Sequence, residues 1–366
     1  MDSMDNVQER IEVLEQRTEQ LKHQTLALAA HTRTVERRRR WWRGIACGMA
    51  LLGLLSLGLP SGQAADLACV AGDVACLIDA INQANTNGEA NTIRLEAGTY
   101  TFTAPDNGGL PDGNNGLPVV TGIVTIQGAG VDATILEANG FCCRLAKITA
   151  TGNLTIDRLT IRRFDAGARS DLIGAGGFLN RGGVLTLTNS RLTEVGGGIG
   201  LGGCIYSSGG TLTLAQTTLT GCTAGHGGGI VHDGGGPFLL LNSTVEYSGA
   251  GTMAGGILTS GGLTMVGSTL RGNQCRADVG GLLTFGTVAI TESTIADNHG
   301  GTAGGIENHG ALTIINSTIA HNSVTPCSDP LSCNGFGGEE AAAIVNQGIT
   351  AIVLSSTIAD NQALEH

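Results

Sequence analysis

A repeat of 24 to 25 residues in the second half of the sequence constrains the fold more than any other feature. Each copy has an apolar-Thr-apolar triplet, then Ser-Thr-apolar, then Asn and, after a loop, Gly-Gly-apolar, as in residues 262–322. The repeated serine gives the spacing, at Ser243, Ser268, Ser293 and Ser317. A fixed period of this length indicates a solenoid, because one repeat cannot bury its apolar face without a neighbour.

The triplet alternates with period two, which indicates strands rather than helices. Leu312 and Ile314 are expected to point inward, and Thr313 outward. Strands that return to the same register once per repeat form a parallel β-helix, with successive coils about 4.8 Å apart. The sequence therefore predicts an all-β fold, a right-handed parallel β-helix of about ten coils of roughly 24–27 residues. The right-handedness does not follow from the repeat; it rests on the rule for parallel crossovers and on the family resemblance given below.

Aligning the repeats places like residues in columns. Two apolar inward columns are expected, one of Leu154, Leu185, Leu212, Phe238, Leu263, Val288 and Leu312, the other of Ile161, Leu192, Leu219, Val245, Leu270, Ile295, Ile319 and Ile358. A third column, in which Asn would adopt the left-handed conformation of a corner and bond from coil to coil, holds Asn273, Asn298, Asn322 and Asn361. Gly-Gly pairs predict another tight corner before Ile230, Ile257, Leu282 and Ile306.

Charge and cysteine content exclude some partners. Residues 66–366 hold eleven Lys and Arg against 24 Asp and Glu, so nucleic acid is not an expected ligand. Nine of the ten cysteines lie beyond position 65, which favours an oxidising compartment. Local disulfides are expected at Cys69–Cys76 and Cys327–Cys333, while Cys222, in the Asn column, can be explained as a small buried residue. The sequence contains no Cys-x-x-Cys pair, so a cysteine metal site is not expected.

The first 65 residues predict export. Residues 7–35 carry a seam with alternating spacings of four and three, apolar at most positions and threonine at three of them. This pattern predicts either a coiled coil able to self-associate or a charged solvated helix. Arg37–Arg43 precede an apolar run at 44–59, and small residues follow. This is the pattern of a signal peptide cleaved after Ala64, or of an uncleaved membrane anchor, with the N-terminus inside in both cases.

Residues 73–86 are predicted to form a helix that begins at Asp73 and covers the open end of the β-helix. The segment ACLIDAINQAN…NTIRLEAGTYTFT, with VTIQGAG at 124–130 and the later repeats, resembles bacterial surface proteins with a CSLREA domain, in the pectin-lyase-like superfamily. It resembles chlamydial polymorphic outer-membrane proteins more loosely. In place of Cys-Ser-Leu-Arg-Glu-Ala-Ile this chain has Ala75-Cys76-Leu77-Ile78-Asp79-Ala80-Ile81. The resemblance, over about 66–361, implies the fold and carries no catalytic residues.

Four segments are expected. They are a cytoplasmic coiled-coil-like helix at 1–43, a signal peptide or anchor at 44–65, a cap helix with the first strands at 66–117, and β-helix repeats at 118–361.

Few residues are arranged for catalysis. The resemblance implies three kinds of catalytic site in the superfamily members that cleave polysaccharides. They are an Asp cluster that holds calcium beside a basic residue, a pair of Asp residues, and a Gly-His-Gly segment beside a basic residue. Gly225-His226-Gly227 matches the last without the basic residue. Asp297, His321 and Asp360 precede the Asn column on consecutive coils, where a His between carboxylates could act as acid and base or form a weak metal site. A solvated ladder of surface polar groups is the favoured interpretation, because catalysis normally needs a cleft with more convergent groups. No cofactor is predicted, and no residue pattern supports calcium.

The interval between Ser317 and Ser356 contains an insertion at 323–341. Insertions at one corner emerge along one edge of a solenoid, where solenoids commonly bind ligands. Contact residues are therefore expected at Pro326, Asp329, Phe336 and Glu339.

The leading hypothesis is an exported surface β-helix that acts as a non-catalytic adhesive, structural or carbohydrate-binding module. The alternative is a polysaccharide lyase or glycoside hydrolase. One outward column consists of threonines and resembles the flat surface of ice-binding β-helices. Strands favour β-branched residues in any case, so the column does not by itself indicate ice binding. Its members are Thr218, Thr244, Thr269, Thr294, Thr318 and Thr357.

Overall fold

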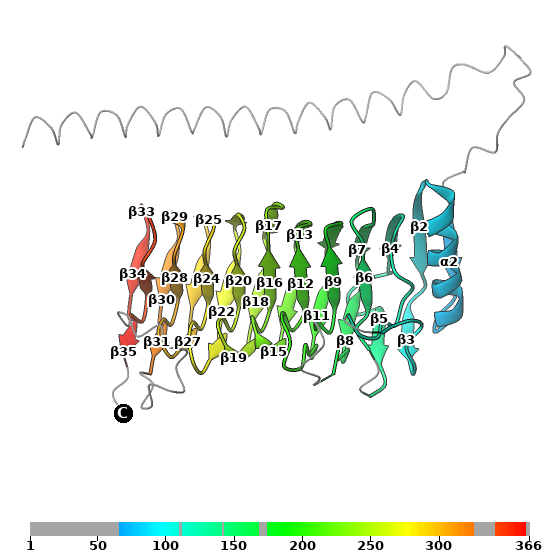
Figure 1. Ribbon diagram of the computed structural model, residues 1–366, viewed down its shortest axis with the longest axis horizontal. Coiled ribbons are helices and arrows are strands. Elements are labelled where there is room, and N and C mark those ends of the chain that lie inside the picture. The colour runs from blue at the N-terminus through cyan, green and yellow to red at the C-terminus, as the bar shows by residue number, and fades with distance from the viewer. Residues whose placement is uncertain (1–65, 110–111, 141–142, 168–173, 326–340, 364–366) are drawn as a thin grey trace, which may run out of the picture. The chain divides into compact units, whose positions relative to one another are not determined.

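The chain folds into a parallel β-helix, as the repeat predicts (Figure 1). The structure, a computed structural model, describes residues 66–109, 112–140, 143–167, 174–325 and 341–363. Four sheets run along the solenoid, named here sheets 1 to 4 in the order in which each complete coil visits them. Pairing between the named strands is parallel throughout, from β1 with β2 to β31 with β35.

Sheets 1 and 2 are the longest. Sheet 1 contains β1 Asp66–Cys69, β2 Ala90–Leu95, β4 Ile123–Gln127, β7 Asn153–Asp157, β10 Val184–Thr188, β13 Thr211–Ala215, β17 Phe238–Leu241, β21 Leu263–Val266, β25 Thr287–Thr291, β29 Ala311–Ile315 and β33 Thr350–Leu354. Sheet 2 contains β3 Gly98–Phe102, β5 Thr134–Ala138, β8 Thr160–Arg162, β11 Arg191–Thr193, β14 Thr218–Thr220, β18 Thr244–Glu246, β22 Thr269–Arg271, β26 Thr294–Ala296, β30 Thr318–Ala320 and β34 Thr357–Ala359.

Sheets 3 and 4 complete each coil. Sheet 3 contains β15 Thr223–His226, β19 Gly249–Thr252, β23 Gln274–Cys275, β27 His299–Gly300, β31 Ser323–Val324 and β35 Gln362–Ala363. Sheet 4 contains β6 Ala146–Ile148, β9 Phe178–Arg181, β12 Ile205–Ser208, β16 Ile230–Asp233, β20 Ile257–Thr259, β24 Leu282–Thr284, β28 Ile306–Asn308 and β32 Ile344–Asn346.

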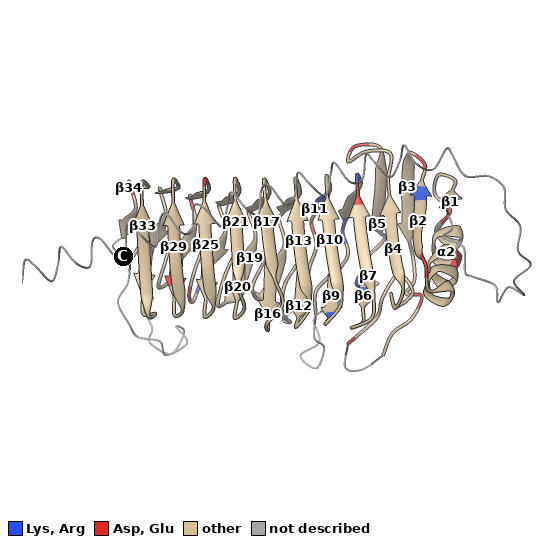
Figure 2. Cartoon of the chain, turned by 90° about the horizontal axis from the view of Figure 1, so that it is seen from above, with Lys and Arg blue, Asp and Glu red and all other residues tan. Residues whose placement is uncertain are grey.

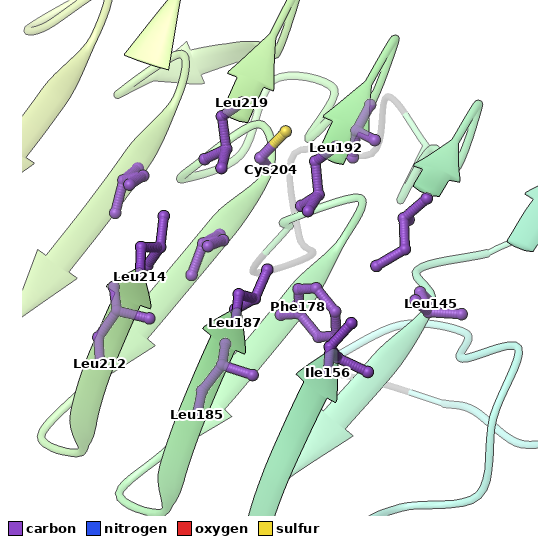
Figure 3. Close-up of a cluster of buried hydrophobic side chains, with 14 of the residues drawn as sticks. Leu145, Ile156, Phe178, Leu185, Leu187, Leu192, Cys204, Leu212, Leu214 and Leu219 are labelled. Atoms are coloured by element: carbon purple, nitrogen blue, oxygen red, sulfur yellow. The ribbon is translucent and has the colours of Figure 1, made fainter. Parts of the chain in front are cut away.

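Aliphatic side chains fill the interior in the predicted columns. Leu185 is paired in register with Leu154 on one side and Leu212 on the other, and all three are fully buried. Figure 3 shows Leu185 and Leu212, and likewise Leu187 and Leu214, at equivalent places on adjacent coils. Both predicted inward columns lie in register, and their residues are buried except Ile358 on the last described coil. Stacking like on like maintains close packing from coil to coil.

A helix covers the N-terminal end of the stack, as predicted. Helix α2, Val74–Asn87, begins where the Asp73 carboxylate accepts a 2.9 Å hydrogen bond from the Cys76 backbone N–H. Its buried face joins the main core and consists of Leu77, Ala80, Ile81 and Ala84. The predicted Cys69–Cys76 disulfide is present and ties the helix to β1.

The corner between sheets 2 and 3 corrects one prediction. The left-handed residue is not the ladder Asn but the residue before it, with φ of 57° at Asp297 and 56° at His321. The Asn side chain instead turns inward, and Asn273, Asn298 and Asn322 are fully buried. The corner therefore needs a left-handed residue followed by a side chain that can bond to backbone.

The Asn ladder connects three coils at a time. Asn298 Oδ1 accepts hydrogen bonds from both the backbone N–H and the Nδ2 of Asn273, each 3.0 Å. Its own Nδ2 donates to the Leu270 carbonyl oxygen at 3.1 Å and to Asn322 Oδ1 at 2.9 Å. Both donors and both acceptor sites of the buried amide are thus used.

A serine ladder at the corner between sheets 1 and 2 was not predicted. Ser293 Oγ accepts the backbone N–H of Ser268 at 3.1 Å and donates to the Thr291 carbonyl oxygen at 2.7 Å. The residue before the serine is again left-handed, as at Glu292, φ 51°. The repeated serine that sets the sequence period is therefore a buried corner residue.

The Gly-Gly pairs are needed because the backbones of adjacent coils approach closely there, and not because the corner requires a special backbone conformation. A Cβ on Gly256 would lie 2.6 Å from the Gly281 carbonyl oxygen, and one on Gly281 would lie 2.3 Å from that of Gly305. The prediction of a tight corner is corrected in its cause: these glycines are not among those with positive φ. Ala342 and Ala343 take the equivalent place in the last coil, where Ile344 pairs with Ile306.

The remaining cysteines correct the explanation given for Cys222. It forms a disulfide with Cys204, with the two Cα atoms 5.4 Å apart. Cys143 is also disulfide-bonded, and Cys275 is a buried free thiol. Cys327 and Cys333 lie outside the described residues.

The last described coil exposes apolar side chains. Val353 is 39% exposed and Ile358 is 48% exposed. In the part of the chain that the structure describes, no helix has the length and apolar character needed to span a bilayer. Residues 7–35 and 44–59, with the predicted coiled coil and signal or anchor, lie outside the described residues.

Candidate functional site

The outer face of sheet 1 has no charged side chain from β10 to β33. Alternate residues of each strand point outward, and in this region they are Thr, Ala, Val, Leu and Ile throughout. Figure 2 shows these strands with charges confined to turns and to other parts of the coil. We call this surface the neutral face; its outward residues are Val184, Thr186, Thr188, Thr211, Thr213, Ala215, Leu239, Leu241, Thr264, Val266, Thr287, Ala289, Thr291, Ala311, Thr313, Ile315, Thr350, Ile352 and Leu354.

Charges do occur on this side of the molecule, but near the N-terminal end. Arg94 of β2 forms a 2.8 Å ion pair with Asp66, and Asp157 of β7 forms one of 3.1 Å with Arg158. From β10 onward such pairs are absent from the outward positions of sheet 1, although residues 66–366 carry 24 acidic side chains. The acidic character of the lobe is therefore displayed elsewhere.

A row of exposed amides borders the neutral face where sheet 1 turns into sheet 2. These are the left-handed residues before the serine ladder, where Asn and Gln are tolerated. The row holds Asn189, Gln216, Asn242 and Asn316, with Glu292 as its charged member. The neutral face is thus flanked by hydrogen-bonding groups.

A second row borders the neutral face where sheet 4 turns into sheet 1. We call it the ridge; on five consecutive coils it holds Asp233, Ser260, Phe285, His309 and Gln347. Ser260 Oγ donates to Asp233 Oδ1 at 2.6 Å, so polar partners join neighbouring coils. Phe285 stands out because its side chain is 46% exposed.

The Phe285 and His309 rings stack on each other, with centroids 4.7 Å apart and planes 17° from parallel. His309 Nε2 lies 2.7 Å from Glu307 Oε1. Glu307 occupies an outward position of β28 that is apolar on neighbouring strands, and it is almost fully buried beneath the loop that leads into sheet 4. The exposed ring pair is therefore attached to a buried carboxyl group.

Beneath the ring pair, Glu307 and Asp278 form a buried carboxyl pair. Thr302 Oγ1 lies 2.7 Å from Asp278 Oδ1 and 3.0 Å from Glu307 Oε2. A hydroxyl carries one proton and donates to only one carboxylate, so the second contact requires a proton on a carboxyl group. Burial, followed by the charge of Glu307, raises the pKa of Asp278 to about 6.

This carboxyl pair does not have the geometry of a glycosidase. Inverting and retaining enzymes hold their carboxyl groups roughly 5–9.5 Å apart across the scissile bond. Asp278 and Glu307 instead share the hydroxyl group of Thr302 and are only 5% and 3% exposed. The pair can hold a proton but cannot receive a sugar between its members.

The pair makes stability depend on pH. The unfolded chain releases the Asp278 proton near pH 4, whereas the folded chain retains it to about pH 6. Folding stability should therefore fall as pH rises from about 4 to 6, by roughly 2–3 kcal/mol from this group. Urea denaturation across this range, compared with Asp278→Asn, measures the effect. An equal decline in the non-titrating variant would contradict it.

The structure places Asp297, His321 and Asp360 on consecutive coils, as predicted. Their position is the left-handed corner residue, and His321 Nε2 lies 3.7 Å from Asp360 Oδ2 with both side chains largely exposed. Elsewhere the same position holds Gly272 or Tyr247. The corner conformation explains polar residues and glycine there, and a catalytic role for the three stays a prediction.

Other sequence candidates fall in different places. Pro326, Asp329, Phe336 and Glu339 lie outside the described residues. His226 Nδ1 is hydrogen-bonded to the Thr252 hydroxyl in sheet 3. The outward Thr column lies in register on sheet 2, beside an Arg271–Glu246 ion pair of 2.6 Å. Among the described residues, no cluster of three or more His, Cys, Asp or Glu side chains could hold a metal ion.

A separate charged cluster attaches the 103–117 loop to sheet 4. Asp112 accepts from Lys147 Nζ at 2.7 Å and from Arg181 at 2.6 Å. Burial alone would raise the pKa of Asp112, but these hydrogen bonds outweigh it and lower the pKa. Buried Arg144 donates to the Asp112 carbonyl oxygen at 2.7 Å and to Asn115 Oδ1 at 3.1 Å. The cluster orders a loop and leaves the neutral face untouched.

Sequence reasoning missed the carboxyl pair and the ridge. Asp278 precedes the Gly-Gly pair of one coil, and Glu307 follows that of the next, so a comparison of matching repeat positions does not join them. The available signal was Glu307, an acid where adjacent coils have Leu283 and Val345.

No family model matches the sequence, and no curated protein matches it. Among solved structures, the chain is similar to the A-module of the Azotobacter vinelandii mannuronan C-5 epimerase AlgE4, at 17% identity and a TM-score of 0.43 over 81% of this chain and 94% of that one. The A-module of AlgE6 from the same organism gives 14% identity and 0.42 over 81% and 92%. The PL6 family alginate lyase AlyGC gives 14% and 0.32 over 87% and 42%. At these identities the likeness is one of architecture.

Proposed function

We propose that this protein is a non-catalytic binding protein for an uncharged polysaccharide, which lies along the neutral face. The carrying observation is the complete absence of charge from the outward positions of β10 to β33 in an otherwise acidic lobe. A protein surface this acidic would repel a polyanion, whereas an uncharged polymer meets no such barrier. An uncharged surface that spans roughly 30 Å, at about 4.8 Å per coil, is unusual enough to suggest a ligand.

The chemistry of the neutral face matches that of a polysaccharide. Threonine methyl groups and aliphatic side chains can contact the apolar faces of sugar rings. Threonine hydroxyls, the exposed amides of Asn189, Asn242 and Asn316, and the ridge can bond to sugar hydroxyl groups. The rise of about 4.8 Å per coil is close to the length of one pyranose unit in a polysaccharide. Equivalent side chains therefore recur along the solenoid at nearly the same interval as the sugar units.

A non-catalytic role is part of this proposal, and the buried carboxyl pair supports it. Hydrolysis needs two carboxyl groups placed on either side of an accessible bond, and Asp278 and Glu307 are joined to each other below the surface. The site of action belongs outside the cytoplasm in this proposal. The Cys69–Cys76 and Cys204–Cys222 disulfides support an oxidising compartment, and residues 44–59 would deliver or anchor the lobe.

A charge placed on the neutral face tests the proposal. Thr264→Lys should weaken retention by neutral β-glucans, xylans or galactans at least about tenfold, because the ammonium group would be desolvated against an uncharged polymer. Thr269→Lys is the matched control, since Thr269 points outward from sheet 2 of the same coil. Affinity electrophoresis measures retention, with alginate and polygalacturonate as anionic comparators.

Two outcomes would contradict the proposal. One is equal retention of both lysine variants and the wild type, and the other is preference for the anionic polymers. A reducing-end assay on the bound polysaccharide should give no signal above background, and a signal would favour the enzyme alternative.

A further inference from the structure

We propose that Phe285 and His309 form a stacking subsite for a single sugar ring at the border of the neutral face. This inference rests on the proposed function and names the place where one pyranose unit is held most tightly. The ligand is a neutral pyranose, whose apolar C–H face would lie on the exposed Phe285 ring. Flanking ridge side chains would bond to its hydroxyl groups.

Phe285 is not required by the fold at its position. The residues in register with it on adjacent coils are Ser260 and His309, and the coils beyond have Asp233 and Gln347. Phe285 nevertheless leaves 46% of its surface in water, in a chain with only 3% aromatic residues. An exposed phenyl group where polar residues serve equally well points to contact with a ligand.

The ring pair is held from below by a buried network. His309 bonds to Glu307 at 2.7 Å, Glu307 to Thr302 at 3.0 Å, and Thr302 to Asp278 at 2.7 Å. Glu307 and Asp278 are almost fully buried, so the network is protected from water. The imidazole on which Phe285 stacks is thus fixed before any ligand arrives, which reduces the entropy lost on binding.

The neighbours of the ring pair indicate a sugar rather than a lipid or an anion. Ser260 and Asp233 lie on one side along the ridge and Gln347 on the other, and all three are exposed donors or acceptors. A lipid chain would need a wider apolar surface than one phenyl ring, and an anion would be repelled by Asp233. A flat apolar ring suits a pyranose when polar groups flank it along the ridge, here Ser260 about 4.8 Å away on the adjacent coil, with Asp233 and Gln347 two coils away on either side.

Phe285→Ser in the full-length chain tests the subsite, because Ser260 shows that the ridge accepts serine at the equivalent position. The ligand would be an oligosaccharide of whichever neutral β-glucan, xylan or galactan the wild type retains best. Calorimetric titration of this oligosaccharide into Phe285→Ser should give a dissociation constant about tenfold higher than for the wild type. Tyr247→Asn is the matched control, since Tyr247 is also an exposed aromatic residue, 57% exposed, at the corner between sheets 2 and 3. This control should bind like the wild type.

Phe285→Trp supplies a second readout when its fluorescence is compared with that of the unchanged chain, because Trp41 and Trp42 contribute the same background to both. Its fluorescence should change on titration with the oligosaccharide and saturate at the calorimetric dissociation constant. A folded Phe285→Ser variant that binds like the wild type, while Thr264→Lys does not, would overturn the subsite and leave the proposed function standing. Failure of the wild type to bind any neutral saccharide would overturn both. Loss in Phe285→Ser but not in Thr264→Lys would establish the subsite without the neutral face.

Discussion

Replacing Ile295 by Asp is expected to lower the free energy of unfolding by several kcal/mol, on the order of 4–5. Ile295 is fully buried and lies between Leu270 and Ile319 in sheet 2. A carboxylate there would have apolar neighbours on both adjacent coils and no partner within the column. Denaturation followed by circular dichroism measures the loss.

Thr294→Asp provides the control for this prediction. Thr294 is the preceding residue, points outward and is only partly buried, so its carboxylate stays hydrated and the cost should remain below about 1 kcal/mol. Equal stability of the two variants would contradict the assignment of inward and outward positions in sheet 2.

Replacing Asn298 by Ala should cost about 4 kcal/mol, because the change removes four hydrogen bonds and leaves their partners buried. The groups that each lose a bond are the backbone N–H and Nδ2 of Asn273, the Leu270 carbonyl oxygen and Asn322 Oδ1. Of these, Asn273 Nδ2 keeps its bond to the Val245 carbonyl oxygen and Asn322 Oδ1 keeps the backbone N–H of residue 298. The loss should appear as a lower denaturation midpoint in urea.

Asn361→Ala separates burial from bond count. Asn361 also accepts two hydrogen bonds from Asn322, each 3.0 Å, and donates two, but it lies on the last described coil and is partly exposed. Water can replace the lost partners there, so the cost should be less than half that of Asn298→Ala. A larger loss at Asn361 would show that burial does not govern the ladder.

The sequence was sufficient for the coil because the fold repeats each interaction. Leu185 and Leu212, or Ile295 and Ile319, occupy the same place in successive repeats, so alignment of the repeats is equivalent to strand register. The same reasoning identified the cap helix and the Cys69–Cys76 bridge, which depend on short separations in sequence.

Interactions between different positions of the repeat were beyond this reasoning. Cys204 and Cys222 belong to different corners of the coil. Asp278 precedes the Gly-Gly pair of its coil, whereas Glu307 follows the Gly-Gly pair of the next coil. Phe285 and His309 are a different case, because they occupy equivalent positions 24 residues apart, and alignment of the repeats places them on adjacent coils. Their spacing does not give the orientation of the two rings, which depends on side-chain conformation.

The two corner ladders give the solenoid a direction. Ser268 N–H donates to the side chain of Ser293, and Asn273 N–H to that of Asn298, so a coil's corner amides find their acceptors on the coil that follows it in the chain. During synthesis, each newly emerged coil would complete the corner bonds of the one before it while leaving its own corner amides to water. The C-terminal coil of a growing stack is therefore always the one whose corner amides are hydrated, and each further coil moves that hydrated boundary one step along the axis.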